Sequence, residues 1–177
     1  MVGNSGSGKS TLARALAARL AVPHIELDGI YHQPGWTPLA EEGLVRRVGE
    51  AAAGDSWVID GNYSAVRLLI WARADTVVWL DLPRRLVMRR IIWRTVSRVI
   101  SRAELWNGNR EPWGNLVRRD PQTSVIAWAW HHHAIYQERY AAAARDPAWA
   151  HLRFIRLTSG REVRALLDHA GRCHTQV

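Results

Sequence analysis

A glycine-rich turn that leads straight into a helix-forming run constrains the fold of this 177-residue chain more than any other feature. The segment Gly3-Asn4-Ser5-Gly6-Ser7-Gly8-Lys9-Ser10-Thr11 matches G-x-x-x-x-G-K-[ST]. Leu12, Leu16 and Leu20 then recur every fourth residue with alanines between them, which favours a helix. A glycine turn at a helix N-terminus is the arrangement of a phosphate-binding loop. A flexible Gly/Ser linker is the alternative, and the helical run argues against it.

Lysine occurs once in the chain, at Lys9, whereas the other 23 of the 24 lysine and arginine residues are arginine. A lysine ammonium is compact enough to reach the β- and γ-phosphates of a nucleotide, and the wide arginine fork does not fit that space. The Ser10 hydroxyl is the expected ligand of Mg²⁺. We therefore expect ATP and Mg²⁺ as cofactors, with the phosphates bound by Gly3, Ser5, Gly6, Ser7, Gly8, Lys9, Ser10 and Thr11.

Helical and strand-forming segments alternate along the chain, which predicts an α/β fold with a parallel sheet. The expected strands are 24–27, 56–59, 76–82 and 151–157, and the expected helices are 9–21, 39–53, 66–73, 84–102, 120–144 and 160–171. Asp120 and Pro121 are the expected cap and first-turn residue of the helix at 120–144. The length favours a single domain over 1–177, and the polar segment at about 98–120 is expected to be a lid-like insert.

Only Met1 and Val2 precede the glycine-rich turn, although a turn of this kind normally follows a buried central strand. Two residues are too few for a strand in the middle of a sheet. We therefore expect that the first strand is truncated in this sequence, or that the start codon is assigned too late.

Three aspartates, Asp28, Asp60 and Asp81, end predicted strands and are followed within two residues by Gly or Pro. The carboxyl ends of parallel strands form the ligand crevice of an open sheet, so all three are expected to face the phosphate site. We expect Asp60 or Asp81 to assist Ser10 in holding Mg²⁺, and Asp28 to contact the acceptor or act as general base. The alternative is that each aspartate is a cap or turn residue.

Arginines crowd the predicted helix after Pro83, and no Asp or Glu lies between Pro83 and Ala103. Four of these arginines are spaced by four residues, and each such pair of like charges costs about 0.2–0.5 kcal/mol. The row therefore indicates an anionic counterpart such as a triphosphate, and the alternative is a solvated face whose stems cover Trp93. The lid candidates are Arg94, Arg98, Arg102 and, in the polar segment that follows, Arg110.

The composition favours anionic partners, because the net charge is +8 and the sequence pI is near 10.9. No apolar run is long enough to span a membrane, and no signal-peptide pattern is seen. The single Cys173 cannot form an internal disulfide, so we expect a cytoplasmic protein. The run His131-His132-His133 is not expected to bind a metal, because adjacent helical residues point about 100° apart.

These motifs resemble those of the adenylate-kinase-like P-loop kinases, and most closely those of the DNA topology modulation proteins. The likeness covers nearly the whole chain, and its elements are Gly3 to Thr11, Glu26-Leu27-Asp28, Pro34-Gly35-Trp36, Trp57 to Tyr63, Asp81 to Arg84 and Ser159 to Val163. It implies a P-loop NTPase three-layer sandwich with a parallel five-stranded sheet and helices on both faces, ATP in the P-loop, and a lid that carries arginines.

One element departs from the adenylate kinase pattern. Those enzymes have Asp-Gly-Phe-Pro-Arg after the third strand, whereas here Asn62-Tyr63 follow Asp60-Gly61 and the next arginine is Arg67. The departure counts against a nucleoside monophosphate as acceptor. Asp28 falls where related small-molecule kinases bind or deprotonate the acceptor hydroxyl.

The expected function is therefore that of an ATP-binding, Mg²⁺-dependent phosphotransferase with Lys9, Asp28 and Asp60 as its catalytic residues. The expected partners are a nucleotide and a small-molecule acceptor whose identity the sequence leaves open. Two alternatives stay open: a nucleic-acid-associated regulator that uses ATP as a switch, and an ATPase without an acceptor. The first has no helix-turn-helix, zinc-ligand or RNA-binding signature to support it.

Overall fold

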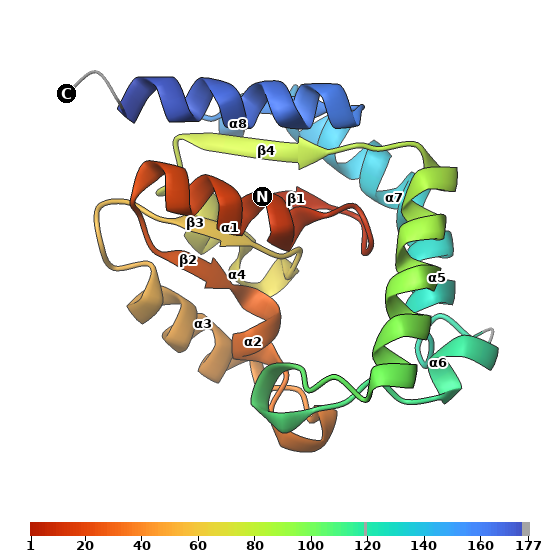
Figure 1. The fold of residues 1–177 in the computed structure, drawn as a ribbon. Coiled ribbons are helices and arrows are strands. Elements are labelled where there is room, and N and C mark those ends of the chain that lie inside the picture. Colours follow the sequence, from red (N-terminus) through yellow and green to blue (C-terminus); the bar gives the residue numbers. More distant parts are fainter. Residues whose placement is uncertain (119, 175–177) are drawn as a thin grey trace.

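The computed structural model describes residues 1–118 and 120–174 (Figure 1). Its strands are β1 (Val2–Gly3), β2 (His24–Glu26), β3 (Val58–Asp60), β4 (Thr76–Leu80) and β5 (Arg153–Leu157). Its α-helices are α1 (Lys9–Leu20), α2 (Leu27–Tyr31), α3 (Glu41–Ala51), α4 (Ser64–Trp71), α5 (Arg84–Ser101), α6 (Gly114–Val117), α7 (Val125–Ala143) and α8 (Gly160–His174). Short 3₁₀ turns are η1 (Pro34–Trp36), η2 (Trp106–Gly108) and η3 (Pro147–Trp149).

The strands pair in parallel, which confirms the predicted α/β class with a parallel sheet. They form a three-stranded sheet of order β1-β4-β5 and a two-stranded sheet of β2 and β3, rather than the single five-stranded sheet that we expected. The physical reason is the length of β1, which has two residues. It is joined to β3 by two hydrogen bonds, from Gly61 N to the Met1 carbonyl and from the Met1 amine to the Ile59 carbonyl.

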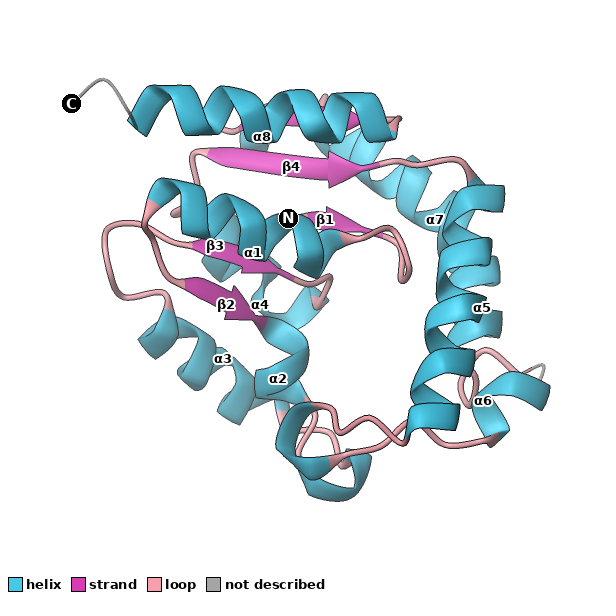
Figure 2. Cartoon of the chain, in the orientation of Figure 1, coloured by secondary structure: helices cyan, strands magenta, loops and turns pink. Residues whose placement is uncertain are grey.

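Side chains alternate between the two faces of β4, as the period of a strand requires. Val78 and Leu80 pack with Leu12 of α1 and with α8 on one face. Val77 and Trp79 belong to a cluster on the other face that includes buried aromatic residues of α4 and α7. Helices therefore cover both faces of the strands, as Figure 2 shows.

The two-stranded sheet is covered in the same manner. Val58 of β3 packs with α1 and α8, whereas Ile59 faces a second cluster that includes Leu44 and Val48 of α3 and Val66 of α4. Leu44, Val48 and Val66 are almost fully buried. The core thus holds β3 with its carboxyl end next to the N-terminus of α1, and this arrangement brings Asp60 to the glycine-rich turn.

Most expected boundaries differ from the observed ones by one to three residues, and two of the differences bear on named residues. The long helix begins at Val125 with Ser124 as its cap, whereas the Asp120 carboxylate accepts from Gln122 N and Thr123 Oγ1 in a local turn. The strand expected at 24–27 ends at Glu26, because Leu27 opens the short helix α2. The helices at 9–21 and 84–102 differ from α1 and α5 by one residue at their C-terminal ends.

Among the residues that the structure describes, no helix is both long and apolar enough to cross a membrane. Arg119, which falls in the expected insert at about 98–120, lies outside the described residues. The side chain of Cys173, on which the expectation about disulfides depends, also lies outside them.

Candidate functional site

Glycines with left-handed backbone shape the turn between β1 and α1. Gly6 and Gly8 have φ angles of +81° and +97°, a region that side chains other than glycine seldom adopt. A Cβ on Gly6 would lie 2.8 Å from Ile91 Cβ, so α5 packs directly against the turn. Asn4 anchors the turn from inside, because its amide donates to the Ala129 carbonyl of α7 at 2.7 Å. The turn is therefore held between α5 and α7.

The N-terminus of α1 emerges from this turn without a side-chain cap. The N–H groups of the first helical turn, residues 9–11, have no acceptor within the helix. They also lie at the positive end of the helix dipole, which attracts anions. The backbone at this position suits the phosphate group that the motif predicts.

Lys9 begins α1, and its ammonium lies among carboxylates. Its Nζ donates to the Asn4 carbonyl at 3.1 Å. Burial lowers the pKa of Lys9, and the charges of Asp28, Asp60 and Glu26 oppose that shift. An anion beside this ammonium would restore part of the electrostatic stabilisation that burial removes.

Ser10 and Asp60 meet at the carboxyl end of β3. The Ser10 hydroxyl donates to Asp60 Oδ2 at 2.5 Å, and His24 Nε2 lies 2.7 Å from Asp60 Oδ1. Asp60 is 3% exposed. Because the Ser10 hydroxyl donates its hydrogen bond to Asp60, the lone pairs of the hydroxyl oxygen are left for another partner.

The Ser10–Asp60 pair fits Mg²⁺ by the chemistry of its donors. Mg²⁺ is bound through oxygen atoms, commonly one or two carboxylates together with substrate phosphates. Within residues 1–118 and 120–174, no group of three or more His, Cys, Asp or Glu side chains could hold a metal ion. The run at 131–133 forms no such group, and His133 donates instead to the Leu82 carbonyl at 3.1 Å.

Asp28 lies in the first turn of α2 instead of at a strand end. The Tyr63 hydroxyl donates to Asp28 Oδ1 at 2.7 Å. Burial raises the pKa of Tyr63, and the Asp28 charge raises it further, so the phenol stays protonated and continues to donate. His32 Nε2 lies 3.5 Å from the same hydroxyl, and burial lowers the pKa of His32. Asp28 is close enough to Lys9 to affect its pKa, which places the two on a common site.

The arginines of α5 differ in their reach toward the glycine-rich turn. Arg90 Nη1 donates to the Ser7 carbonyl at 3.2 Å. Arg94 is partly buried, and its buried Nε has no hydrogen-bond partner among the described residues. Burial lowers the pKa of Arg94, as does the charge of Arg98, whereas Asp28 opposes the shift. Arg90 and Arg94 thus face the region of Lys9 and Asp28.

The remaining lid candidates lie further along α5. Arg98 lies 3.7 Å from Glu111, and its guanidinium is 5.9 Å from the Trp106 ring. Arg102 is the exposed C-cap of α5, and Arg110 is also exposed. A helix rises 1.5 Å per residue, which places Arg102 about 18 Å beyond Arg90. Arg102 therefore lies well beyond the arginine that contacts the glycine-rich turn, and the lid roles of Arg102 and Arg110 stay predictions.

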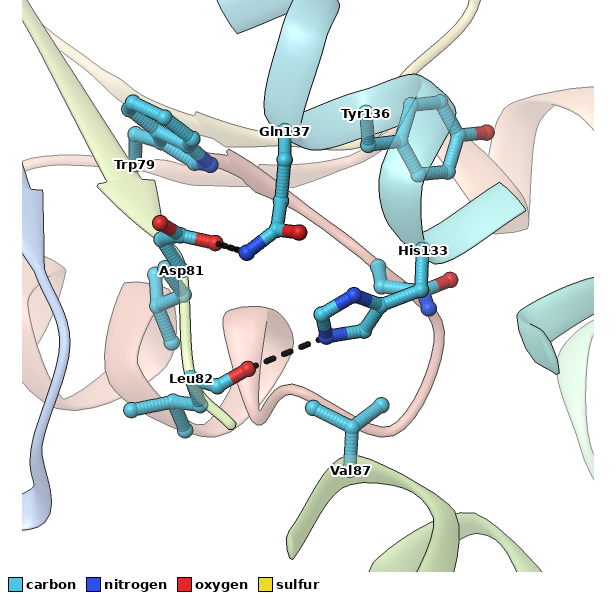
Figure 3. Close-up of a pocket in the computed structure, with 9 residues that line it drawn as sticks. Trp79, Asp81, Leu82, Val87, His133, Tyr136 and Gln137 are labelled. Carbon is cyan, nitrogen blue, oxygen red and sulfur yellow. Dashed lines mark hydrogen bonds between the residues drawn. The ribbon is translucent and has the colours of Figure 1, made fainter. Parts of the chain in front are cut away.

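Asp81 is hydrogen-bonded at both of its carboxylate oxygens. Its Oδ2 accepts two hydrogen bonds from Arg156. Its Oδ1 accepts one from Gln137 at 2.7 Å (Figure 3). Asp81 and Gln137 line a cavity of about 10 Å³ between β4, α5 and α7, whereas Arg156 reaches Asp81 from β5. Asp81 is thus ion-paired with Arg156, whereas Ser10 has Asp60 as its partner, and a metal role for Asp81 stays a prediction.

Residues 104–110 contact α2 and the segment that follows it. The Asn107 amide donates to the Gly29 carbonyl at 3.1 Å, and the Asn109 amide donates to the Gln33 carbonyl at 2.9 Å. Trp36 N donates to Asn109 Oδ1 at 2.8 Å. The polar segment after α5 therefore contacts the Asp28 side of the site.

Sequence reasoning missed four residues at this site: Asn4, His24, Glu26 and Asn62. Asn62 bonds both backbone groups of Gly3, and it accepts from Tyr140 at 3.0 Å. Glu26 pairs in register with Asp60 on the neighbouring strand. Asn62 and Glu26 each lie two positions from an aspartate that we selected, Asp60 and Asp28. Closeness to those aspartates in the sequence could have identified them. No pattern in the sequence pointed to His24.

Comparison with known proteins gives a partial likeness. A shikimate kinase of Symbiobacterium thermophilum is 35% identical over 96 residues, a stretch that covers 46% of this chain and 55% of that protein. The chain therefore spans about half the length of the relative that it matches. No protein-family model matches the chain. The likeness supports a P-loop kinase and a phosphotransferase, and it gives no support to the narrower likeness to the DNA topology modulation group.

Proposed function

We propose that this chain binds ATP with Mg²⁺ and transfers the γ-phosphoryl group to a hydroxyl of a small-molecule acceptor. The observation that carries the proposal is the meeting of three features at one place: the uncapped N-terminus of α1, the Lys9 ammonium and the Ser10–Asp60 hydrogen bond of 2.5 Å. The partial likeness to a shikimate kinase supports the same reaction class.

In this proposal the glycine-rich turn binds the phosphates through its backbone N–H groups, and Lys9 moves from the Asn4 carbonyl to a phosphate oxygen. Arg90 and Arg94 add positive charge from α5. When bound at Ser10 and Asp60, Mg²⁺ would neutralise charge that develops on the transferred group. Phosphoryl transfer depends mainly on such positioning and charge neutralisation, and this chain's residues are suited to both.

Asp28 is the proposed contact of the acceptor hydroxyl. Its carboxylate is oriented by the Tyr63 hydroxyl and is near enough to Lys9 to share a site with the phosphates. A carboxylate placed in this manner can accept the proton that the hydroxyl loses on transfer. We propose that the acceptor binds in the region around Asp28, His32 and Tyr63.

We also propose that the chain is one domain with a lid-like insert at about 98–120, and that it acts in the cytoplasm. The contacts of Asn107 and Asn109 with the segment after α2 support a covering role for this insert. A lid that excludes water favours transfer to the acceptor over hydrolysis.

Isothermal titration calorimetry with ATP and Mg²⁺ tests the binding step. Lys9→Ala is expected to weaken ATP binding at least about 100-fold while the unfolding midpoint changes little, because a charged phosphate contact is lost at a site with no structural ion pair. Arg85→Ala, on the exposed side of α5, is the control and should bind ATP as the unmodified protein does. Unchanged ATP affinity in Lys9→Ala would contradict the proposal.

The transfer step needs a separate assay. ATP turnover is measured against nucleoside monophosphates, nucleosides and small hydroxylated acids, and stimulation by one class identifies the acceptor. Turnover that no acceptor stimulates would indicate an ATPase. Binding of DNA with a steep dependence on salt concentration, and with ATP changing its affinity, would favour the nucleic-acid-associated regulator instead.

A further inference from the structure

His24 is a partly buried histidine that bonds to the candidate magnesium ligand, and the proposed reaction assigns it no role. Its Nε2 lies 2.7 Å from Asp60 Oδ1, and the two side chains are 16% and 3% exposed. A carboxylate oxygen only accepts hydrogen bonds, so Nε2 carries the proton and donates it. His24 reaches Asp60 from the neighbouring strand, because β2 pairs with β3 two positions further along, at Glu26 and Asp60.

The Asp60 carboxylate is thereby held at both oxygens. Ser10 occupies Oδ2 and His24 occupies Oδ1. Two bonds to different elements, α1 and β2, fix the rotation of the carboxylate about its Cβ–Cγ bond. This orientation keeps the Ser10 proton directed toward Asp60, and it leaves the hydroxyl oxygen available to a cation.

The competing partner of Asp60 is the Lys9 ammonium. Lys9 directly precedes Ser10 at the start of α1, so its ammonium and the Asp60 carboxylate are opposite charges at the same end of the helix. A carboxylate that lost its bond to His24 could turn toward Lys9. It would then neutralise the ammonium that the phosphates require and release the Ser10 hydroxyl.

We propose that His24 is a positioning residue that fixes the Asp60 carboxylate for magnesium-dependent nucleotide binding at Ser10. The inference rests on the proposed function. It adds a residue that acts through Asp60, in the way that outer partners of metal ligands orient those ligands.

The test compares His24→Gln with His24→Asn by calorimetry of ATP binding, once with Mg²⁺ and once with EDTA. The Gln amide can reach the position of Nε2, whereas the Asn amide is too short. With Mg²⁺, His24→Asn is expected to bind ATP about 10-fold more weakly, as for other partners of metal ligands. With EDTA its affinity should lie within about twofold of the unmodified protein, and His24→Gln should recover most of the lost affinity in Mg²⁺.

His151→Asn is the matched control, because His151 also donates from Nε2, to the Trp71 carbonyl at 3.0 Å, away from the site. It should show no magnesium-specific loss. Equal losses with Mg²⁺ and EDTA, no loss at all, or no recovery in His24→Gln would each overturn the role of His24. Failure of the unmodified protein to bind ATP would instead overturn the proposed function, so the two failures are distinguishable.

Discussion

The ends of β3 and β4 carry similar aspartates in different surroundings. Asp60 is bonded by a serine hydroxyl and a histidine, beside the glycine-rich turn. Asp81 is bonded by the Arg156 guanidinium and the Gln137 amide, on the side of α7. Both carboxylates are almost fully buried.

The difference lies in how each negative charge is balanced. Arg156 lies 2.5 Å from Asp81, so that charge has a cationic partner in the folded protein. The Asp60 charge is stabilised by hydrogen bonds and by the more distant Lys9. A buried carboxylate that no guanidinium pairs with is a more suitable partner for an incoming cation than one already held by an arginine.

The largest expected effect is that of Asp60→Asn on turnover. The amide keeps the shape but loses the charge that would help to hold the cation and orient Ser10. ATP turnover with Mg²⁺ is expected to fall about 100-fold, equivalent to about 2.7 kcal/mol. Steady-state kinetics checks this value. Asp81→Asn should retain turnover within about threefold, and an equal fall in both variants would remove the distinction between the two strand ends.

The next largest effect is a loss of stability, and we expect it from substitution of Asp81 rather than of Asp60. Asp81→Asn leaves Arg156 without its carboxylate, and loss of a buried ion pair is costly. Arg156 is 57% exposed, so solvent screens part of that cost, and we expect a loss of about 1–2 kcal/mol. Urea unfolding measures it. An Arg156→Met background should reduce the loss, because the pair is then already absent.

A smaller effect is expected from Gln137→Ala. The substitution removes the donor to Asp81 Oδ1 and should cost about 1 kcal/mol of unfolding free energy, the usual contribution of one hydrogen bond. ATP affinity should stay unchanged in calorimetry. A weakened ATP affinity would show that Asp81 influences nucleotide binding, and it would contradict the distinction between Asp81 and Asp60.

The smallest effect extends the comparison to Asp28, whose neighbour His32 is partly buried. Burial lowers the pKa of His32 from its ordinary 6.5. Below pH 6.5 the unfolded chain gains a proton that the folded protein does not, so the unfolding free energy should fall as the pH drops from 6.5 toward the lower folded pKa. The slope is at most about 1.4 kcal/mol per pH unit. Thermal unfolding from pH 7.5 to 5 should show a smaller fall in His32→Gln, and identical curves would contradict the assignment.

Local patterns were enough to predict part of the site. The glycines at 3, 6 and 8 adopt left-handed backbone angles, and α1 begins at Lys9 as its motif predicts. The apolar run Val77-Val78-Trp79-Leu80 lies in the strand expected at 76–82, and it forms the buried strand β4. These features depend on neighbours in sequence, because backbone strain and side-chain periodicity act over a few residues.

Other expectations failed where two local solutions compete. Asp120 and Ser124 are both good helix caps, and the Asp120 carboxylate is used by the turn at 122–123 instead. Arg90 and Arg102 belong to one row of the helix sequence, yet only the first reaches the glycine-rich turn. Arginines four residues apart lie near one another on the helix, but over the twelve residues from Arg90 to Arg102 the direction turns by about 120° and the helix rises about 18 Å, so the two contact different regions.

The sequence by itself determined that a glycine turn would deliver a lysine and a serine to the start of a helix, because these residues are adjacent in the chain and their backbone preferences are local. The tertiary structure alone decided which aspartate meets that serine. Asp60 lies fifty residues from Ser10 and Asp81 lies seventy-five from Arg156, and only the packing of β3, β4 and β5 against their helices brings each pair together. Over such separations, the packing of the core decides which polar side chains meet. The apolar side chains of the core do not themselves indicate which polar contact their packing will produce.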